Sequence, residues 1–233
     1  MKQKFKKVVS LILVFTISFA ISVPSLAAQS STSNSSSISN YQALIDKINK
    51  EYGVSLFIPT KTELKKAEIS NTSRATSMSS ESKEQFEDQL REIAKNLSKQ
   101  NTEAQAAWEA ATSNKSEDSP IVTSGKLVAS VTNVSSQNKD IEGAEAYFEG
   151  YVNDSTGYWR WTKFTKTGVT PDYSSDTVKF MMDDKYGTYS YKFIDSHRTC
   201  SVIYKGTMYT NTILGWVAAK SSQYVEWYAS EGL

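Results

Sequence analysis

The chain has 233 residues with one cysteine and one histidine, and its 26 basic side chains nearly balance 25 acidic ones. A single cysteine excludes an intrachain disulfide. The near-neutral balance gives no reason to expect nucleic acid as a partner, because duplexes are bound by clustered Lys and Arg. With 39% apolar and 12% aromatic residues, the chain can stabilise itself by burying a core.

The first 27 residues predict a cleaved export signal. Four lysines precede an apolar run over residues 8–23, Pro24 breaks the helix, and small residues end at Ala27, where a signal peptidase would cut. A membrane anchor is the alternative, but it needs nearer 20 apolar residues. We therefore expect a secreted product without a stable membrane span. Its net charge is −3, because the signal holds four of the basic residues and none of the acidic ones.

Residues 28–40 are rich in serine and are expected to form a flexible linker. A helical segment over residues 41–111 follows. It begins with a short amphipathic helix over 41–52, capped by Asn40, and a brief apolar strand over 54–58. Thr60 and Glu63 have the spacing of a capping box, which predicts a second short helix through about residue 68.

Residues 81–111 carry the strongest helical pattern, because their apolar side chains recur at steps of three, four or seven. Two arrangements fit such a long helix. It can fold back on the helix over 41–52 as an intramolecular helical hairpin, or it can self-associate as a coiled coil through about four heptads.

Residues 112–120 are expected to be a linker, after which the apolar period changes to two. Alternation predicts short strands over 146–152, 158–165, 177–182, 188–194, 199–205, 207–214 and 223–228, with joints at Gly, Asp, Asn or Ser, Gly206 among them. Short strands with short joints indicate an antiparallel β domain over residues 121–233. The predicted fold class is α+β: an N-terminal helical segment followed by an antiparallel β-sandwich or small β-barrel.

The candidate catalytic groups have simpler explanations. His197 and Cys200 lie close in sequence, but three residues apart on a strand they face opposite sides, and a buried Cys200 is the favoured interpretation. A hydrolase would need two of His197, Asp183, Asp195, Glu149 and Glu226 in one cleft. One His and one Cys do not make a usual zinc site, and no calcium loop has regular ligand spacing. We expect no catalytic residues, metal site or cofactor.

The aromatic content of the β domain is its most suggestive feature. Trp159 and Trp161 face one way on one predicted strand, whereas Tyr158, Arg160 and Phe164 face the other; Tyr189 and Tyr191 share a face of another strand. If one set is exposed, it marks a contact surface, so Trp159, Trp161, Tyr189 and Tyr191 are the candidate binding residues. The alternative is that these rings fill a two-layer core.

Two stretches resemble uncharacterised secreted proteins of Gram-positive bacteria. They are YQALIDKINKEYGVSLFIPTKTELKKAEI and the tyrosine-rich hairpin YSYKFIDSHRTCSVIYKG, with its Asp-x-x-Arg-Thr turn; together they cover about a fifth of the chain. The resemblance implies secretion and brings no activity. The sequence thus favours a secreted, non-enzymatic binding protein directed at cell-wall glycan or at a surface or secreted protein. A secreted hydrolase and a toxin or antimicrobial protein are the alternatives.

Overall fold

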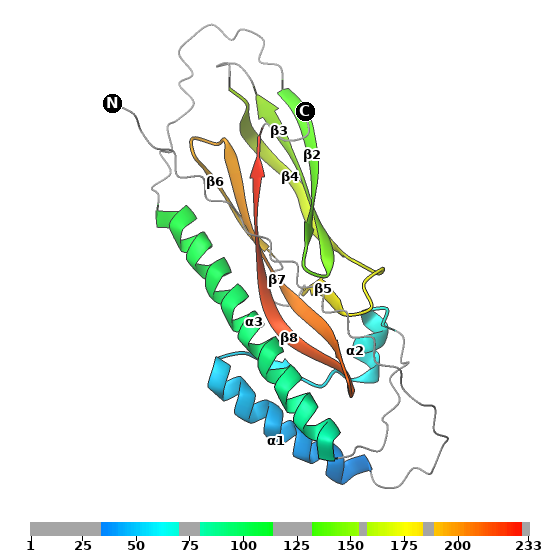
Figure 1. Cartoon of the computed structure of the whole chain (residues 1–233). Helices are drawn as coiled ribbons and strands as arrows, with labels where there is room; N and C mark the ends of the chain where they lie inside the picture. Colours follow the sequence, from blue (N-terminus) through cyan, green and yellow to red (C-terminus); the bar gives the residue numbers. More distant parts are fainter. Residues whose placement is uncertain (1–33, 70–79, 114–131, 154–157, 184–188, 230–233) are drawn as a thin grey trace, which may run out of the picture. The chain divides into compact units, whose positions relative to one another are not determined.

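A computed structural model describes residues 34–69, 80–113, 132–153, 158–183 and 189–229. The expected export signal over residues 1–27 lies outside the described residues. Ser35–Leu233 forms one compact unit, in which helices and antiparallel sheets occur together (Figure 1). The chain therefore has the α+β class that its sequence predicts.

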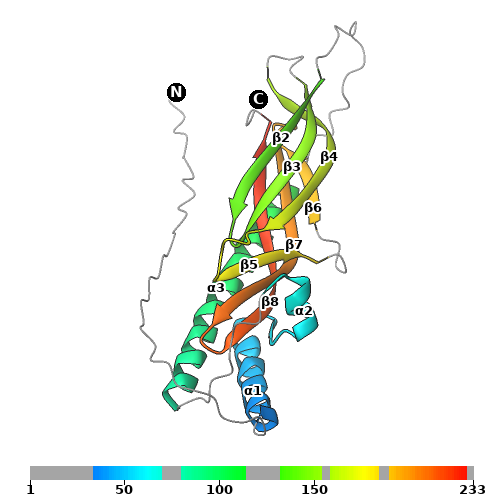
Figure 2. The same cartoon turned by 90° about the vertical axis from the view of Figure 1, so that its right-hand side faces the viewer.

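The strands form two antiparallel sheets. The first contains β1 (Leu56–Phe57), β8 (Gly215–Tyr228), β7 (Thr199–Thr212) and β5 (Val178–Met182) in that order, and β6 (Tyr189–Ile194) also pairs with β7. The second is a meander of β2 (Thr132–Ile141), β3 (Ala144–Asn153) and β4 (Arg160–Pro171), seen in the foreground of Figure 2. The sheets do not close into a barrel, so the barrel alternative is wrong.

Gly206 lies inside β7 and does not end a strand, contrary to the prediction of a joint there. A Cβ atom at this position would collide with the carbonyl oxygen of Met181 and the ring of Phe180. Glycine is needed because β5 approaches β7 closely, not because the chain turns. β6 pairs with the first half of β7, up to Tyr204, and β5 pairs with the second half, from Gly206 onward.

The three helices are α1 (Asn34–Tyr52), α2 (Lys61–Lys66) and α3 (Ser80–Ser113). α1 begins earlier than predicted, so residues 34–40 are helical and Asn40 does not cap it. The capping box of α2 is confirmed: the Thr60 hydroxyl accepts from the Glu63 amide, and the Glu63 carboxylate accepts from the Thr60 amide at 2.6 Å. α3 confirms the strong helical pattern of residues 81–111.

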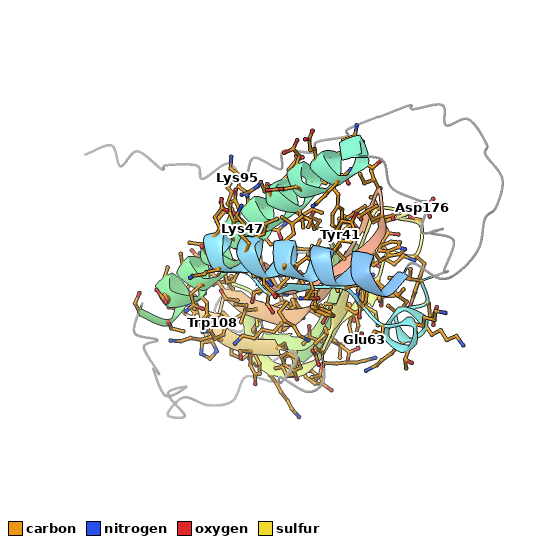
Figure 3. All side chains as sticks on the ribbon, turned by 90° about the horizontal axis from the view of Figure 1, so that it is seen from below. Tyr41, Lys47, Glu63, Lys95, Trp108 and Asp176 are labelled. Carbon is orange, nitrogen blue, oxygen red and sulfur yellow. The ribbon has the colours of Figure 1, made fainter. Side chains whose placement is uncertain are left out.

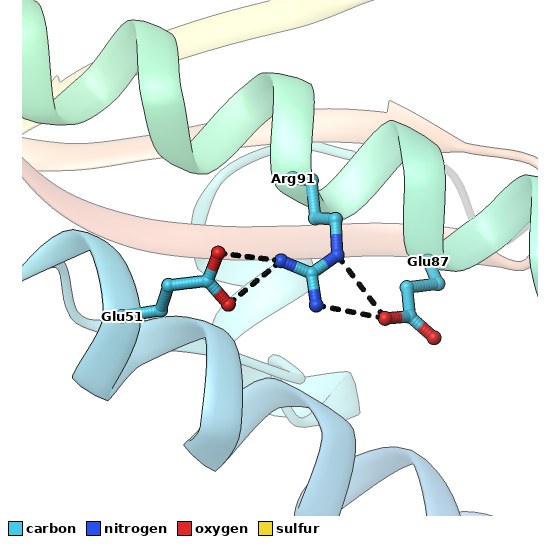
Figure 4. A network of polar contacts seen from close by, with 3 residues as sticks. All are labelled: Glu51, Glu87 and Arg91. Atoms are coloured by element: carbon cyan, nitrogen blue, oxygen red, sulfur yellow. Dashed lines mark hydrogen bonds and ion pairs between the residues drawn. The ribbon is translucent and has the colours of Figure 1, made fainter.

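Two of the contacts between α1 and α3 show how the helices run relative to each other. The rings of Tyr41 and Phe86 meet edge to face at 5.3 Å, and Arg91 donates to both carboxylate oxygens of Glu51 at 2.7 Å and to Glu87 at 2.9 Å (Figure 4). These contacts occur in the same order along both helices. The pair is therefore not the antiparallel hairpin that the sequence suggested.

The helices and both sheets share one core. α3 lies against β8, β7 and β6, and its buried Phe86, Leu90 and Leu97 join Ile45 and Ile48 of α1 in the main apolar cluster. That cluster continues between the sheets through three large rings. Phe148 of β3 packs against Trp161 of β4 at 4.8 Å and against Trp227 of β8 at 5.6 Å. A smaller cluster beneath α2 includes Leu64, Tyr209 and Ala218.

Candidate functional site

A row of aromatic side chains runs from the core to the surface between β4 and β6. We call it the aromatic strip; it consists of Phe164, Tyr189, Tyr191, Phe193 and His197. The rings of Phe164 and Tyr191 stack at 4.3 Å with an angle of 16° between their planes. Tyr191 is 42% exposed, whereas the other four members are half-buried. The strip therefore presents an accessible ring that stacks on a half-buried one.

The alternation of β6 places the strip. Tyr189, Tyr191 and Phe193 are two residues apart and pair across the ladder with Tyr204, Val202 and Cys200 of β7, so all three point to the side of the second sheet. Aromatic residues suit such a half-buried pleated surface. Tyr191 and Phe193 also meet edge to face at 5.8 Å, which fixes the ring orientations within the row.

The turn after β6 has an uncommon backbone. Asp195, Ser196 and His197 have φ angles of 53°, 52° and 67°, in the left-handed region that costs an L-residue about 1–2 kcal/mol. His197 is held from two sides. Its carbonyl accepts from the Trp161 amide at 2.8 Å, and its Nδ1 lies 3.1 Å from the Trp161 carbonyl oxygen. These bonds tie the turn to the start of β4 and complete the strip.

The four predicted binding residues do not lie together at the surface. Trp161 is fully buried, and its indole N–H donates to the Trp227 carbonyl at 3.0 Å, so its ring belongs to the core. Trp159 is half-buried beside that core. Tyr189 and Tyr191 are both in the aromatic strip, with Tyr191 the more exposed. For Trp161, the alternative prediction is therefore the correct one: its ring fills the core and does not form a contact surface.

The predicted facing of β4 is also wrong in one respect. Arg160 and Phe164 were expected on the same face, yet Phe164 packs on the core ring of Phe148 while Arg160 pairs with Asn153. One of the two register shifts in the β3–β4 ladder, the one between Tyr151 and Val152, lies between them and changes the alternation. A β-bulge adds one residue to one strand and so reverses the facing of all that follows.

Three of the candidate catalytic groups, Cys200, Glu226 and Asp183, have structural roles. Cys200 is fully buried, and burial raises the pKa of its thiol, which disfavours the thiolate that would act as a nucleophile. Glu226 accepts hydrogen bonds from Tyr224 at 2.9 Å and from Tyr228 at 2.7 Å. Asp183 instead forms an ion pair with Lys220. Glu226 and Asp183 thus each have a structural partner.

A cleft of about 420 Å³ crosses the first sheet beside Asn101 of α3, and Asp183, Lys205 and Lys220 line it together with Gly206 and two serines. Its charges largely compensate one another through the Asp183–Lys220 pair. Within the described ranges, no three His, Cys, Asp or Glu side chains gather closely enough to hold a metal ion.

Comparison with known protein families finds no matching family model, and comparison with curated proteins and with solved structures also finds no match. In the part of the chain that the structure describes, no helix is long and apolar enough to span a membrane. The site must therefore be interpreted from its own geometry.

Proposed function

We propose that the protein is a secreted, non-enzymatic binding protein whose aromatic strip contacts cell-wall glycan. The observation that carries this proposal is the stack of the 42% exposed Tyr191 on Phe164 at 4.3 Å. An exposed ring that is already immobilised loses little conformational entropy on binding, which favours its use as a contact. The export signal expected over residues 1–27 would bring this surface to the cell wall.

A flat aromatic ring with a hydroxyl can stack on the apolar face of a sugar and accept or donate a hydrogen bond at the rim. The strip offers this combination at Tyr191, with the His197 ring at the other end of the row, 5.2 Å from Phe193. A surface or secreted protein is the other partner that the sequence suggests, because exposed aromatic anchors also serve protein interfaces.

The test is retention of the chain from residue 28 onward on purified Gram-positive cell walls. We expect binding that Tyr191→Ala weakens at least tenfold, and that enzymatic digestion of the wall glycan abolishes. Tyr173→Ala is the matched control, because Tyr173 is exposed to a similar extent, at 49%, but lies outside the strip. Equal retention of both variants would contradict the proposal. Binding that survives glycan digestion and depends on Tyr191 would assign a protein partner in place of the glycan.

A further inference from the structure

Three basic residues of β4 project from the outer face of the second sheet, the face away from the core. They are Arg160, Lys163 and Lys166, which pair across the ladder with Asn153, Tyr151 and Glu149 of β3. A spacing of three would place neighbours on opposite faces of a regular strand. The two register shifts, which lie between these pairs, bring all three cations to the same face.

Threonine hydroxyls accompany these irregularities. Thr162 donates to the Tyr151 carbonyl at 3.1 Å, Thr165 donates to the Glu149 carbonyl at 2.7 Å, and Thr167 donates to the Tyr147 carbonyl at 2.6 Å. The sequence RWTKFTKT accordingly places a basic residue at every third position, and Thr162 and Thr165 directly precede the two lysines. Bulges often occur beside functional sites, where they change the direction in which a side chain points. This pattern therefore indicates that the three cations have a functional role on this face.

Two tyrosines of β3 share the outer face with the cations. The Lys163 Nζ lies 5.9 Å from the ring centre of Tyr151, and the Lys166 Nζ lies 5.3 Å from that of Tyr147. Tyr147 lies flush over Gly168, where a Cβ atom would sit 2.5 Å from its hydroxyl. Covering a strand glycine with a ring is itself stabilising. That effect accounts for Tyr147 but not for a row of cations.

Among the residues that the structure describes, the three cations have no acidic ion-pair partner. The nearest acid in the ladder, Glu149, accepts from the Thr165 hydroxyl at 3.1 Å. The Nε of Arg160 is buried without any hydrogen-bond acceptor. A buried donor left unpaired is costly, and a bound anion would supply the missing acceptor.

The row has a regular repeat. Each step from one cation to the next spans two residues of β3, which is about 7 Å along the strand. The outer face is open: Ser136 and Asn138 of β2 and both lysines are exposed, and Figure 2 shows the three strands in front of the rest of the fold. Evenly spaced positive charges on an open strip complement a linear polymer with repeated negative charges.

We infer that the outer face of the second sheet binds a linear anionic polysaccharide. Arg160, Lys163 and Lys166 pair with its acidic groups, while Tyr147 and Tyr151 stack on its sugar rings. The tyrosines between the cations favour a polysaccharide over polymers that lack sugar rings. This surface is separate from the aromatic strip, so the inference does not depend on the proposed function.

The test measures binding of the chain from residue 28 onward to dextran sulfate and to alginate, with unmodified dextran as the uncharged comparison. We expect both anionic polymers to bind and dextran not to bind, with an affinity that falls as salt increases. The double variant Lys163→Gln/Lys166→Gln should weaken binding at least tenfold. Tyr151→Ala should weaken it to a smaller extent.

The matched control is Lys47→Gln/Lys95→Gln, which removes the same charge from two exposed lysines of α1 and α3 (Figure 3). It should leave the affinity unchanged. Equal losses in the two double variants would overturn the inference, since net charge alone would then explain binding. Polyphosphate or duplex DNA bound as tightly as the polysaccharides, with no effect of Tyr151→Ala, would overturn the assignment to a polysaccharide.

Discussion

β7 and β4 are both long strands beside the same core, but they use their residues in opposite ways. β7 is regular. Ten of the eleven residues from Thr199 to Tyr209 are buried, Gly206 among them, and Lys205 is the exposed one. β4 has only Trp161 and Gly168 buried, and register shifts interrupt its ladder with β3. β7 lies within the layers of the fold, whereas β4 covers the core with one side and presents cations with the other.

The contrast between β7 and β4 indicates which substitutions should affect stability and which should affect binding. A strand that is buried on both faces is constrained by packing at nearly every position, since protein interiors are close-packed. A strand with one open face can change that face at little cost in stability. We therefore expect substitutions in β7, and on the inner side of β4, to act through folding. Substitutions on the outer side of β4 should act through binding.

The largest effect is expected at Trp161, where β4 contributes most to the core. Trp161→Ala removes a fully buried ring and its hydrogen bond to the Trp227 carbonyl. We expect a loss of about 3–5 kcal/mol in the free energy of unfolding, from lost burial and the cavity left behind. Urea denaturation followed by circular dichroism measures this loss.

Trp159→Ala is the matched comparison, because Trp159 is only half-buried and lies two residues away. It should cost clearly less stability than Trp161→Ala. Equal costs would show that the depth of burial does not decide stability at the start of β4, and the contrast with β7 would lose its basis.

A smaller effect is expected from adding one methyl group to a glycine of each strand. In β7, Gly206→Ala drives a Cβ atom into the backbone of Met181, which cannot move without disturbing the β5–β7 ladder. Overpacking of this kind typically costs about 1–3 kcal/mol. In β4, Gly168→Ala meets only the outer end of the Tyr147 side chain, which can swing away. Its cost should be below about 1 kcal/mol.

Thermal and urea unfolding of the two alanine variants compare these values directly. Gly206→Ala should lower the unfolding midpoint more than Gly168→Ala. If the inferred polysaccharide site is correct, Gly168→Ala should also weaken dextran sulfate binding at nearly unchanged stability. The reverse order of stabilities would mean that β4 is the more tightly constrained strand.

The sequence alone predicts those parts of the fold that depend on a local period. The long apolar stripe of α3 and the capping box of α2 are confirmed. In each case the side chains that decide the structure lie within a few residues of one another. The antiparallel strands and the α+β class follow from the same local signals.

The errors arise where a distant segment decides the structure. Gly206 resembles a turn residue in sequence, but the backbone of β5 is what requires it. The predicted two-residue alternation of side-chain facing fails along 158–165, because the bulges bring every third residue to the same face. The spacing of the basic residues in RWTKFTKT shows this period of three. The burial of Trp161 follows from Phe148 and Trp227, which no local pattern connects to it. Phe164 and Tyr191 likewise come together only across two sheets.

The smallest predicted effect uses pH to compare the buried strand with the open one. Cys200 of β7 is buried, and burial raises the pKa of its thiol above the value of about 8.5 in an unfolded chain. The folded state therefore keeps the neutral thiol, while the unfolded state begins to ionise above pH 8.5. The resulting stabilisation is complete below that pH and is lost as the pH rises further, by at most about 1.4 kcal/mol per pH unit.

Urea unfolding of the wild type between pH 7 and 10 should show this decline, and Cys200→Ala should have a shallower slope above pH 8.5. The double variant Lys163→Gln/Lys166→Gln leaves the Cys200 thiol in place and is expected to keep this decline. Identical slopes in the wild type and Cys200→Ala would show that the thiol is reached by solvent before global unfolding. In that case β7 opens locally, and its packing constrains the fold less than its burial indicates.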